Sequence, residues 1–397
     1  MILKDCNKDR IHILILTENL AVGGQEKHTL RLARTIDRSR YHITVGYVGD
    51  GPLREDYESL GVPLLNYSRT LKFKGRLRKV QIPWINPYRI LAPAVKVVKF
   101  VRQRDIDIIQ TNGIFSYMVG STASRLTGVP SIRSQPNIMK TDEKRYYNFF
   151  KQLPFYYWTS RYIVYAKPQK DELLELSVPE ERIYDVGDYG IDINEFNPNI
   201  SGMKVRSEFG IAPEVPVVGQ AGRLVKSKRF DFMLHGAQLV IEQIPETVFL
   251  IVGEGAERKQ LEKLAESLGV RQNVIFAGLR LDMPQVIAAL DICVFTMEDT
   301  RGGMVNWEAM ASGKPIVCTE GPSGLQRTLI DSGSNGILVP SDDINSFAKA
   351  IVTLIRDPNQ RRRMGKEGRK RCEARYDFAK IVTPKLQQLY DELKQVS

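Results

Sequence analysis

The chain has 397 residues, of which 43% are hydrophobic and 26% charged, a composition typical of globular proteins and sufficient for two domains. No run approaches the ~18 consecutive apolar residues of a transmembrane helix, and the apolar run at Ile11–Leu16 is too short for a signal peptide. The formal charge of +11 favours an anionic ligand or surface. The four cysteines lie far apart in the sequence and indicate reduced thiols, so we expect a cytoplasmic protein.

The first half of the chain alternates short apolar runs with segments of helical spacing. We expect strands at Ile11–Leu16, Tyr41–Val48, Gly61–Leu65, Asp107–Gln110, Ser131–Ser134 and Tyr162–Ala166. We expect helices after the Gly23–Gly24 pair and at Ala92–Arg104, Tyr117–Leu126 and Gln169–Leu176. Strands that alternate with helices of these lengths favour a parallel, doubly wound sheet.

A basic segment interrupts this pattern. From Leu60 through Arg104 there are eleven Lys or Arg and no Asp or Glu, and residues 69–80 are the densest part. Tyr67, Phe73 and Trp84 lie in or beside it. Cations mixed with aromatic residues suit an anionic membrane surface or a phosphorylated acceptor. A solvated loop and helix face is the alternative, and no nucleic-acid-binding motif accompanies the segment, so we expect no nucleic-acid partner.

Residues 187–202 are rich in Gly, Asp, Asn and Pro and are expected to link two domains. The pattern then restarts. Strands are expected at Val215–Ala221, Val248–Val252, Val274–Ala277, Ile292–Thr296, Ile316–Thr319 and Gly336–Val339, and helices at Arg229–Ile244, Glu257–Leu268, Pro284–Leu290 and Ile344–Arg356. This predicts a second sheet domain. Cys293 and Cys318 fall inside its strands and are expected to be buried thiols, not disulfide or zinc ligands.

The segment TMEDTRGGMVNWEAMASGKPIVCT, residues 296–319, reads as strand, polar loop, helix and strand. Ligands of open α/β sheets bind at such loops, outside the carboxyl ends of the strands. Gly302 and Gly303 would let a ligand approach the backbone, and Glu308 would hydrogen-bond a ribose. The alternative is a tight turn whose acidic residue merely favours the helix N-terminus.

Cations follow the first strand of the second domain. Gly222 makes the turn, and Arg223 and Lys228 follow within one short loop before a helix. Arginine binds phosphate as a fork and lysine as a point charge, so the pair suits a diphosphate. The alternative is two surface cations in a basic protein. Gly253 and Gly255 follow the next strand as a short Gly-x-Gly, which is weak by itself.

Five motifs in order resemble one family: GGQE at 23–26, GRLVKSK at 222–228, VGEG at 252–255, VIFAG at 274–278 and EAMASGKPIV at 308–317. Together they resemble the retaining family 4 glycosyltransferases, also called glycosyl transferases group 1. The resemblance implies the α/β GT-B fold, with two Rossmann-like doubly wound parallel-sheet domains facing across a cleft. It implies domains at residues 1–190 (acceptor side) and 200–375 (nucleotide sugar), and a helical segment at 376–397 that crosses back to the first.

The resemblance also implies roles for residues. Arg223 and Lys228 would be catalytic, because they would bind the donor diphosphate and stabilise the leaving nucleotide in place of a metal ion. No metal or other cofactor is therefore expected. Glu308 would hold the ribose. The donor-binding set would be Gly222, Gly253, Gly255, Asp299, Thr300, Gly302, Gly303, Met304 and Glu308. Gly23 and Gly24 would let the first-domain loop approach the diphosphate and the acceptor.

The chain departs from the family pattern at two places. The family usually has a glutamate eight positions before the ribose glutamate, where this chain has Thr300, preceded by Glu298 and Asp299. The family often has a histidine after the strand that ends near Ser134, but this segment is RSQPN. Asn112 and Gln135 are the candidates to line that part of the site.

The resemblance implies a retaining, metal-independent hexosyltransferase that moves a sugar from a nucleotide-diphosphate donor to an acceptor hydroxyl. The expected acceptor is a glycan or lipid-linked saccharide in cell-surface polysaccharide, lipopolysaccharide or glycolipid assembly. The expected place is the inner face of the membrane, with residues 69–80 as a contact to anionic lipids. The alternative is a non-catalytic protein of the same fold that binds nucleotide sugars or acts as a partner subunit, which Thr300 and the missing histidine favour.

Overall fold

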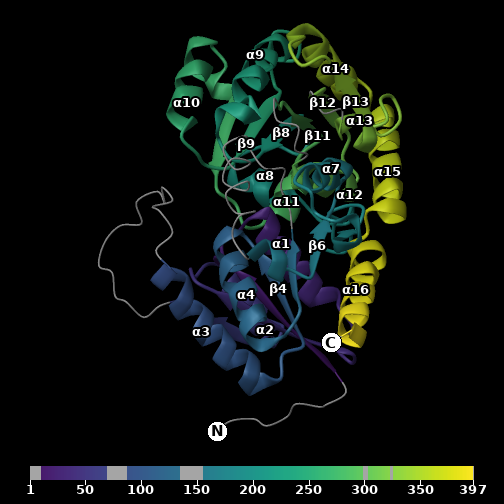
Figure 1. Cartoon of the computed structure of the whole chain (residues 1–397). Helices are drawn as coiled ribbons and strands as arrows, with labels where there is room; N and C mark the ends of the chain where they lie inside the picture. Colours follow the sequence, from purple (N-terminus) through teal and green to yellow (C-terminus); the bar gives the residue numbers. More distant parts are fainter. Residues whose placement is uncertain (1–9, 69–86, 135–154, 298–302, 322–324, 397) are drawn as a thin grey trace. The chain divides into compact units, whose positions relative to one another are not determined.

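The computed structural model describes residues 10–68, 87–134, 155–297, 303–321 and 325–396. The chain forms two compact units, Met1–Tyr189 with Phe378–Ser397, and Gly190–Asp377. Each unit is built on one sheet, and every strand pair within both sheets is parallel (Figure 1).

The first unit contains a seven-stranded sheet in the order β3-β2-β1-β4-β5-β6-β7. Its strands are β1 Ile11–Thr17, β2 Tyr41–Tyr47, β3 Leu64–Asn66, β4 Ile108–Asn112, β5 Ser131–Ser134, β6 Arg161–Val164 and β7 Ile183–Asp185. Its helices are α1 Gly24–Thr35, α2 Leu53–Ser59, α3 Pro87–Arg104, α4 Ile114–Thr127, α6 Phe155–Trp158, α7 Lys167–Glu175 and α16 Thr383–Val396, with a 3₁₀ turn η1 Glu180–Arg182 and a π-helical turn η4 Phe378–Val382.

Strand β1 shows how the sequence builds this unit. Successive side chains of a strand point to opposite faces of the sheet. Ile13 and Ile15 accordingly belong to the core that also contains residues of α1 and α16, whereas Leu14 and Leu16 belong to the core that contains residues of α3 and α4. A continuous apolar run is what a strand covered on both faces requires.

The second unit contains a six-stranded sheet in the order β10-β9-β8-β11-β12-β13. Its strands are β8 Val217–Ala221, β9 Val248–Val252, β10 Val274–Gly278, β11 Ile292–Phe295, β12 Ile316–Thr319 and β13 Gly336–Val339. Its helices are α8 Met203–Glu208, α9 Phe230–Ile241, α10 Arg258–Ser267, α11 Met283–Ala289, α12 Met304–Ala311, α13 Leu325–Leu329, α14 Ile344–Arg356 and α15 Pro358–Arg375, with 3₁₀ turns η2 Lys226–Lys228 and η3 Arg271–Asn273.

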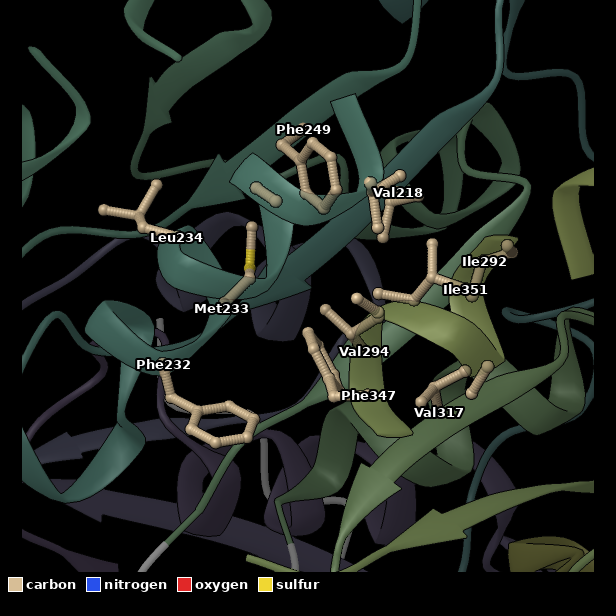
Figure 2. Close-up of a cluster of buried hydrophobic side chains, with 14 of the residues drawn as sticks. Val218, Phe232, Met233, Leu234, Phe249, Ile292, Val294, Val317, Phe347 and Ile351 are labelled. Carbon is tan, nitrogen blue, oxygen red and sulfur yellow. The ribbon is translucent and has the colours of Figure 1, made fainter. Parts of the chain in front are cut away.

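Figure 2 shows one face of this second sheet. Val218, Val294 and Val317 from three strands meet Phe347 and Ile351 of α14. The alternate residues of the same strands face the other core, and Cys293 and Cys318 lie there as buried free thiols. The expectation that these two cysteines are core residues is therefore confirmed.

The sequence predicted the strands better than the helices. Every expected strand is present, with ends within three residues of the expected ones. The edge strand β7 and the helices α2, α8, α13 and α15 were not expected. The segment after Arg375 is helical from Phe378 onward and packs in the first unit, where the Tyr390 hydroxyl donates to Gln110 Oε1 at 2.7 Å.

Candidate functional site

The candidate diphosphate loop follows β8 in the second unit and runs from Gly222 to Arg229. Arg223 is exposed, and Lys228 is the last residue of η2. The Lys228 ammonium lies 3.7 Å from Met297 Sδ, so this loop lies beside the residue that follows β11 and Thr296. Because β8 and β11 are neighbours in the sheet, their carboxyl ends bring these two loops together.

The loop that follows β9 contains Gly253 and Gly255 and packs directly against the diphosphate loop. Leu224 N donates to Glu254 O at 3.0 Å. A Cβ atom at Gly253 would lie 2.0 Å from Gly222 O, and one at Gly255 would lie 2.3 Å from Leu224 O. The backbone of the diphosphate loop therefore occupies the space that side chains at 253 and 255 would need. These glycines are required for close backbone packing, and their contact with a donor stays a prediction.

A buried polar pair holds the end of the diphosphate loop. Thr296 Oγ1 lies within hydrogen-bonding distance of the carbonyl oxygens of Lys228 (3.0 Å) and Arg229 (2.7 Å) and of Gln220 Oε1 (2.9 Å). Gln220 Nε2 donates to the Lys228 carbonyl at 2.9 Å. Both side chains are almost fully buried. Two adjacent strands thus fix the backbone on which the Lys228 side chain is mounted.

Arg229 completes the turn, but its side chain faces elsewhere. Its backbone is left-handed, with φ 46°, a conformation that costs a non-glycine residue free energy and must be held by its surroundings. The guanidinium donates to Asp342 Oδ1 at 2.7 Å and to Ser341 O at 3.0 Å, and it lies over the Phe232 ring. Arg229 therefore anchors the loop to the segment after β13.

Neither Gln220 nor Thr296 was predicted from the sequence to be functional. Gln220 is a polar residue inside an otherwise apolar strand, VVGQA, and Thr296 ends the apolar run that precedes the glycine loop. A polar side chain in or at the end of a buried strand needs a hydrogen-bond partner. The sequence therefore indicated that Gln220 and Thr296 form hydrogen bonds inside the domain.

Helix α12 carries the residues predicted to hold the sugar and ribose. Gly303 is its N-cap, Met304 its first residue, and Glu308 its fifth residue of eight. Glu308 is only 3% exposed, and no acidic residue lies in the first turn. The alternative that Glu308 merely favours the helix N-terminus is therefore wrong, because that effect fades beyond the first turn. Its ribose contact stays a prediction.

A glycine ends α12. Gly313 follows the C-cap residue Ser312 with φ 68°, a left-handed conformation that glycine adopts without strain. The next residue, Lys314, donates to Ala288 O at 2.8 Å and Leu290 O at 2.7 Å. Burial lowers the pKa of Lys314 from its usual value. The Lys314 side chain thus binds the C-terminal carbonyls of α11 and is not part of the carboxyl edge.

Four predicted site residues lie outside the described residues. They are Asp299, Thr300, Gly302 and Gln135. Their roles stay predictions.

The carboxyl edge of the first sheet gathers Glu18, Asn112 and the start of α1. Glu18 Oε1 accepts from Phe115 N at 2.8 Å, and a Cβ at Gly113 would meet that carboxylate. Asn112 Nδ2 donates to Thr29 Oγ1 at 2.7 Å, and Asn112 is buried. Asn112 is the last residue of β4, and its place in an acceptor site stays a prediction.

The Gly23–Gly24 pair opens α1, with Gly23 as the N-cap in an extended conformation. A Cβ at Gly23 would lie 2.2 Å from Glu26 Oε2, so glycine leaves room for the Glu26 carboxyl. Burial raises the pKa of Glu26, and the nearby Glu18 carboxylate acts in the same direction. Close by on α1, burial lowers the pKa of His28 to about 3, with the Arg31 guanidinium acting the same way, so His28 is neutral at physiological pH.

In the part of the chain that the structure describes, no three His, Cys, Asp or Glu side chains gather in a way that could hold a metal ion. None of the helices in that same part is long and apolar enough to cross a membrane.

Two Rossmann-like parallel sheets in one chain, each with side chains gathered at its carboxyl edge, define the GT-B class of fold. Residues 22–187 match the model of glycosyltransferase family 4, and residues 203–371 match that of glycosyl transferases group 1. The chain belongs to this family of glycosyltransferases.

Curated relatives carry several names. The chain is 32% identical over 186 residues to the lipopolysaccharide core biosynthesis glycosyltransferase LpsE of Rhizobium meliloti, covering 46% of this chain and 52% of LpsE. It is 26% identical over 275 residues to the UDP-Gal:alpha-D-GlcNAc-diphosphoundecaprenol alpha-1,3-galactosyltransferase of Escherichia coli, covering 66% of this chain and 70% of that protein. For several of these relatives, LpsE among them, the match spans about half of the relative's length.

Among solved structures, Anabaena HepE in complex with UDP and glucose superposes with a TM-score of 0.79 at 23% identity. The match covers 97% of this chain and 100% of HepE. WaaG, a glycosyltransferase involved in lipopolysaccharide biosynthesis, superposes with a TM-score of 0.67 at 16% identity, covering 96% and 99% of the two chains. At these identities the likeness confirms the expected GT-B fold.

Proposed function

We propose that this protein transfers a hexose from a nucleotide-diphosphate donor to an acceptor hydroxyl with retention of configuration. The observation that supports it most is the diphosphate loop, which carries Arg223 and Lys228 at the carboxyl edge of the second sheet and is fixed by the buried Gln220–Thr296 pair. Family membership and the names of the relatives support the class of reaction.

In the proposed reaction, the acceptor oxygen bonds to the anomeric carbon of the sugar while the bond from that carbon to the β-phosphate oxygen breaks. The acceptor proton passes to the leaving phosphate oxygen. Attack from the face that the phosphate leaves retains the configuration. Arg223 and Lys228 would stabilise the charge that develops on the diphosphate, which makes a metal ion unnecessary in this proposal.

The acceptor side of the proposal follows from the names of relatives. LpsE belongs to lipopolysaccharide core biosynthesis, and the name of the E. coli relative gives a diphosphoundecaprenol-linked sugar. A glycan or lipid-linked saccharide at the inner face of a membrane would suit a basic first unit. Residues 69–80, the basic segment expected to contact anionic lipid, lie outside the described residues.

The test is thermal unfolding of the purified protein with UDP, UDP-glucose, GDP and GDP-mannose at millimolar concentration. A ligand that binds only the folded state raises the unfolding midpoint. At a ligand concentration a hundredfold above its Kd, the midpoint should rise by about 5 °C. We expect one nucleotide class to do so. The absence of a shift with all four would contradict the proposal. A shift without sugar transfer to any of a broad panel of lipid-linked and glycan acceptors would favour the non-catalytic alternative.

Replacing Thr296 by valine should raise KM for the bound nucleotide sugar and lower kcat, together reducing kcat/KM by about tenfold. The hydroxyl that holds the Arg229 carbonyl is lost, the Lys228 carbonyl keeps Gln220 Nε2 as its donor, and the loop shifts. Initial rates of nucleotide release measure this effect. Thr296→Ser keeps the hydroxyl and should restore most of the activity. Thr353→Val is the matched control, since the Thr353 hydroxyl donates to Lys349 O on the exposed side of α14. Equal losses in both valine variants would refute the positioning role.

A further inference from the structure

Helix α3 exposes aliphatic side chains on its outer face. Leu91 and Val95 lie one turn apart and are 47% and 61% exposed. On the opposite side of the same helix, Ala94, Val97 and Val101 are buried against the sheet. The buried stripe packs on the sheet, and Leu91 and Val95 lie outside that stripe.

Helix α4 extends this surface. Both helices pack on the same core beneath the sheet, and they lie side by side (Figure 1). Arg102 Nη2 of α3 donates to Leu126 O of α4 at 3.2 Å, and the Leu126 side chain is 52% exposed. Leu91, Val95 and Leu126 are therefore the aliphatic part of what we call the outer α3–α4 surface.

The charge of this surface has one sign. Lys96, Lys99, Arg102 and Arg125 lie on it. Neither Pro87–Arg104 nor Ile114–Thr127 contains a single Asp or Glu. The first carboxyl group beyond α3 is Asp105, directly after its last residue. No carboxylate of either helix can therefore neutralise these cations.

Helix α15 shows that this combination is not a general property of the protein. It is also rich in cations, but Glu367 and Glu373 pair with Lys370 and Arg369 at 2.7 and 2.6 Å. Its one large apolar side chain, Met364, is buried. The α15 surface is thus basic without exposed aliphatic residues.

We propose that the outer α3–α4 surface docks on a lipid membrane that carries anionic headgroups. Cations attract the headgroups, and aliphatic side chains enter the boundary with the acyl chains, so a membrane uses both features of the surface. A nucleic acid would use only the cations. The proposal deepens the proposed function and rests on it, because a transferase of lipid-linked saccharides must work at the bilayer.

The test is co-sedimentation of the full chain with vesicles of phosphatidylcholine alone and of an equal mixture of phosphatidylcholine and phosphatidylglycerol. We expect binding to the mixed vesicles and much weaker binding to the neutral ones. Lys99→Gln with Arg102→Gln should weaken binding to the mixed vesicles about 25-fold, at about fivefold for each cation. Leu91→Gln with Val95→Gln should weaken it about tenfold or more.

Two control variants match these changes elsewhere. Arg363→Gln with Lys366→Gln removes the same charge from exposed positions of α15, and Leu279→Gln with Leu281→Gln removes exposed leucines after β10. Both should bind the mixed vesicles nearly as wild type does. Equal losses in the charge control would show that only net charge matters, and this would overturn the proposal.

Three further outcomes would also overturn it: failure of the wild type to bind the mixed vesicles, unchanged binding of both α3 variants, and binding to polyuridylate in place of vesicles. The same proteins should keep the thermal shift with UDP or GDP. A wild type that shows the nucleotide shift but binds no mixed vesicles would refute docking alone, and a wild type that binds vesicles but no nucleotide would refute the proposed function alone.

Discussion

Replacing Lys228 by alanine should lower kcat for sugar transfer by about a hundred- to a thousandfold. Removing one preorganised group that stabilises developing negative charge costs this much in other enzymes, and Lys228 is mounted on backbone that Thr296 and Gln220 hold in place. Because the charge on the diphosphate grows as the bond to the sugar breaks, the loss should appear mainly in kcat and less in KM. Arg223→Ala should also lower kcat. Its KM should rise more than that of Lys228→Ala, because arginine also binds the ground-state diphosphate with two parallel hydrogen bonds.

Lys226 provides the control, since it lies in the same turn and carries the same charge. Lys226→Ala should change kcat/KM by less than about threefold, as expected for a screened surface charge. Nucleotide release from the donor that raises the unfolding midpoint is the measurement. A Lys228→Ala enzyme with unchanged kcat and raised KM would restrict Lys228 to binding, and one indistinguishable from Lys226→Ala would remove it from the site.

Most strands of this fold were predictable because they are short apolar runs bounded by glycine, proline and polar residues, and the central strands are buried on both faces. The edge strand β7 is short and partly exposed, and it was not predicted. Helix α15 was not, for a physical reason. Its buried residues are Met364, Gly365, Gly368 and Cys372, a narrow stripe in which two members have no side chain. A Cβ at Gly365 would lie 1.9 Å from Gly313 O, so the helix packs by backbone contact and leaves almost no hydrophobic pattern.

The part of the candidate site that directly follows predicted strands could be predicted from the sequence. Gly222, Gly253, Gly255 and the cations of the diphosphate loop were identified because each comes just after a strand. The reason for the glycines was not predictable, because the loop backbone that fills their side-chain space comes from another strand. The Gln220–Thr296 hydrogen bond joins residues 76 positions apart, and only the order of β8 and β11 in the sheet makes them neighbours.

Replacing Arg206 by methionine should lower the free energy of unfolding by about 3 kcal/mol or more. The Arg206 side chain is buried and lies near the start of β8, at the opposite edge of the sheet from the diphosphate loop. Its guanidinium donates to the carbonyl oxygens of Ala289, Ala212, Pro213 and Val215 and pairs with Asp291 Oδ2 at 2.8 Å. Methionine fills similar volume but removes the guanidinium donor. The Ala212 carbonyl keeps Val215 N and the Asp291 carboxylate keeps Val217 N. The buried Ala289 carbonyl, however, loses the donor that Arg206 supplies, and an unsatisfied buried acceptor costs free energy.

Urea unfolding followed by circular dichroism measures this loss, and Arg327→Met is the control. Arg327 pairs with Glu320 at 2.7 Å, but its side chain is 68% exposed, so its loss should cost less than about 1 kcal/mol. Arg206→Lys separates charge from geometry, because an ammonium group keeps the pair with Asp291 but cannot reach carbonyls on opposite sides at once. We expect it to recover less than half of the loss. Full recovery by lysine would mean that the ion pair alone stabilises this edge. A methionine variant as stable as wild type would mean that water replaces the guanidinium there.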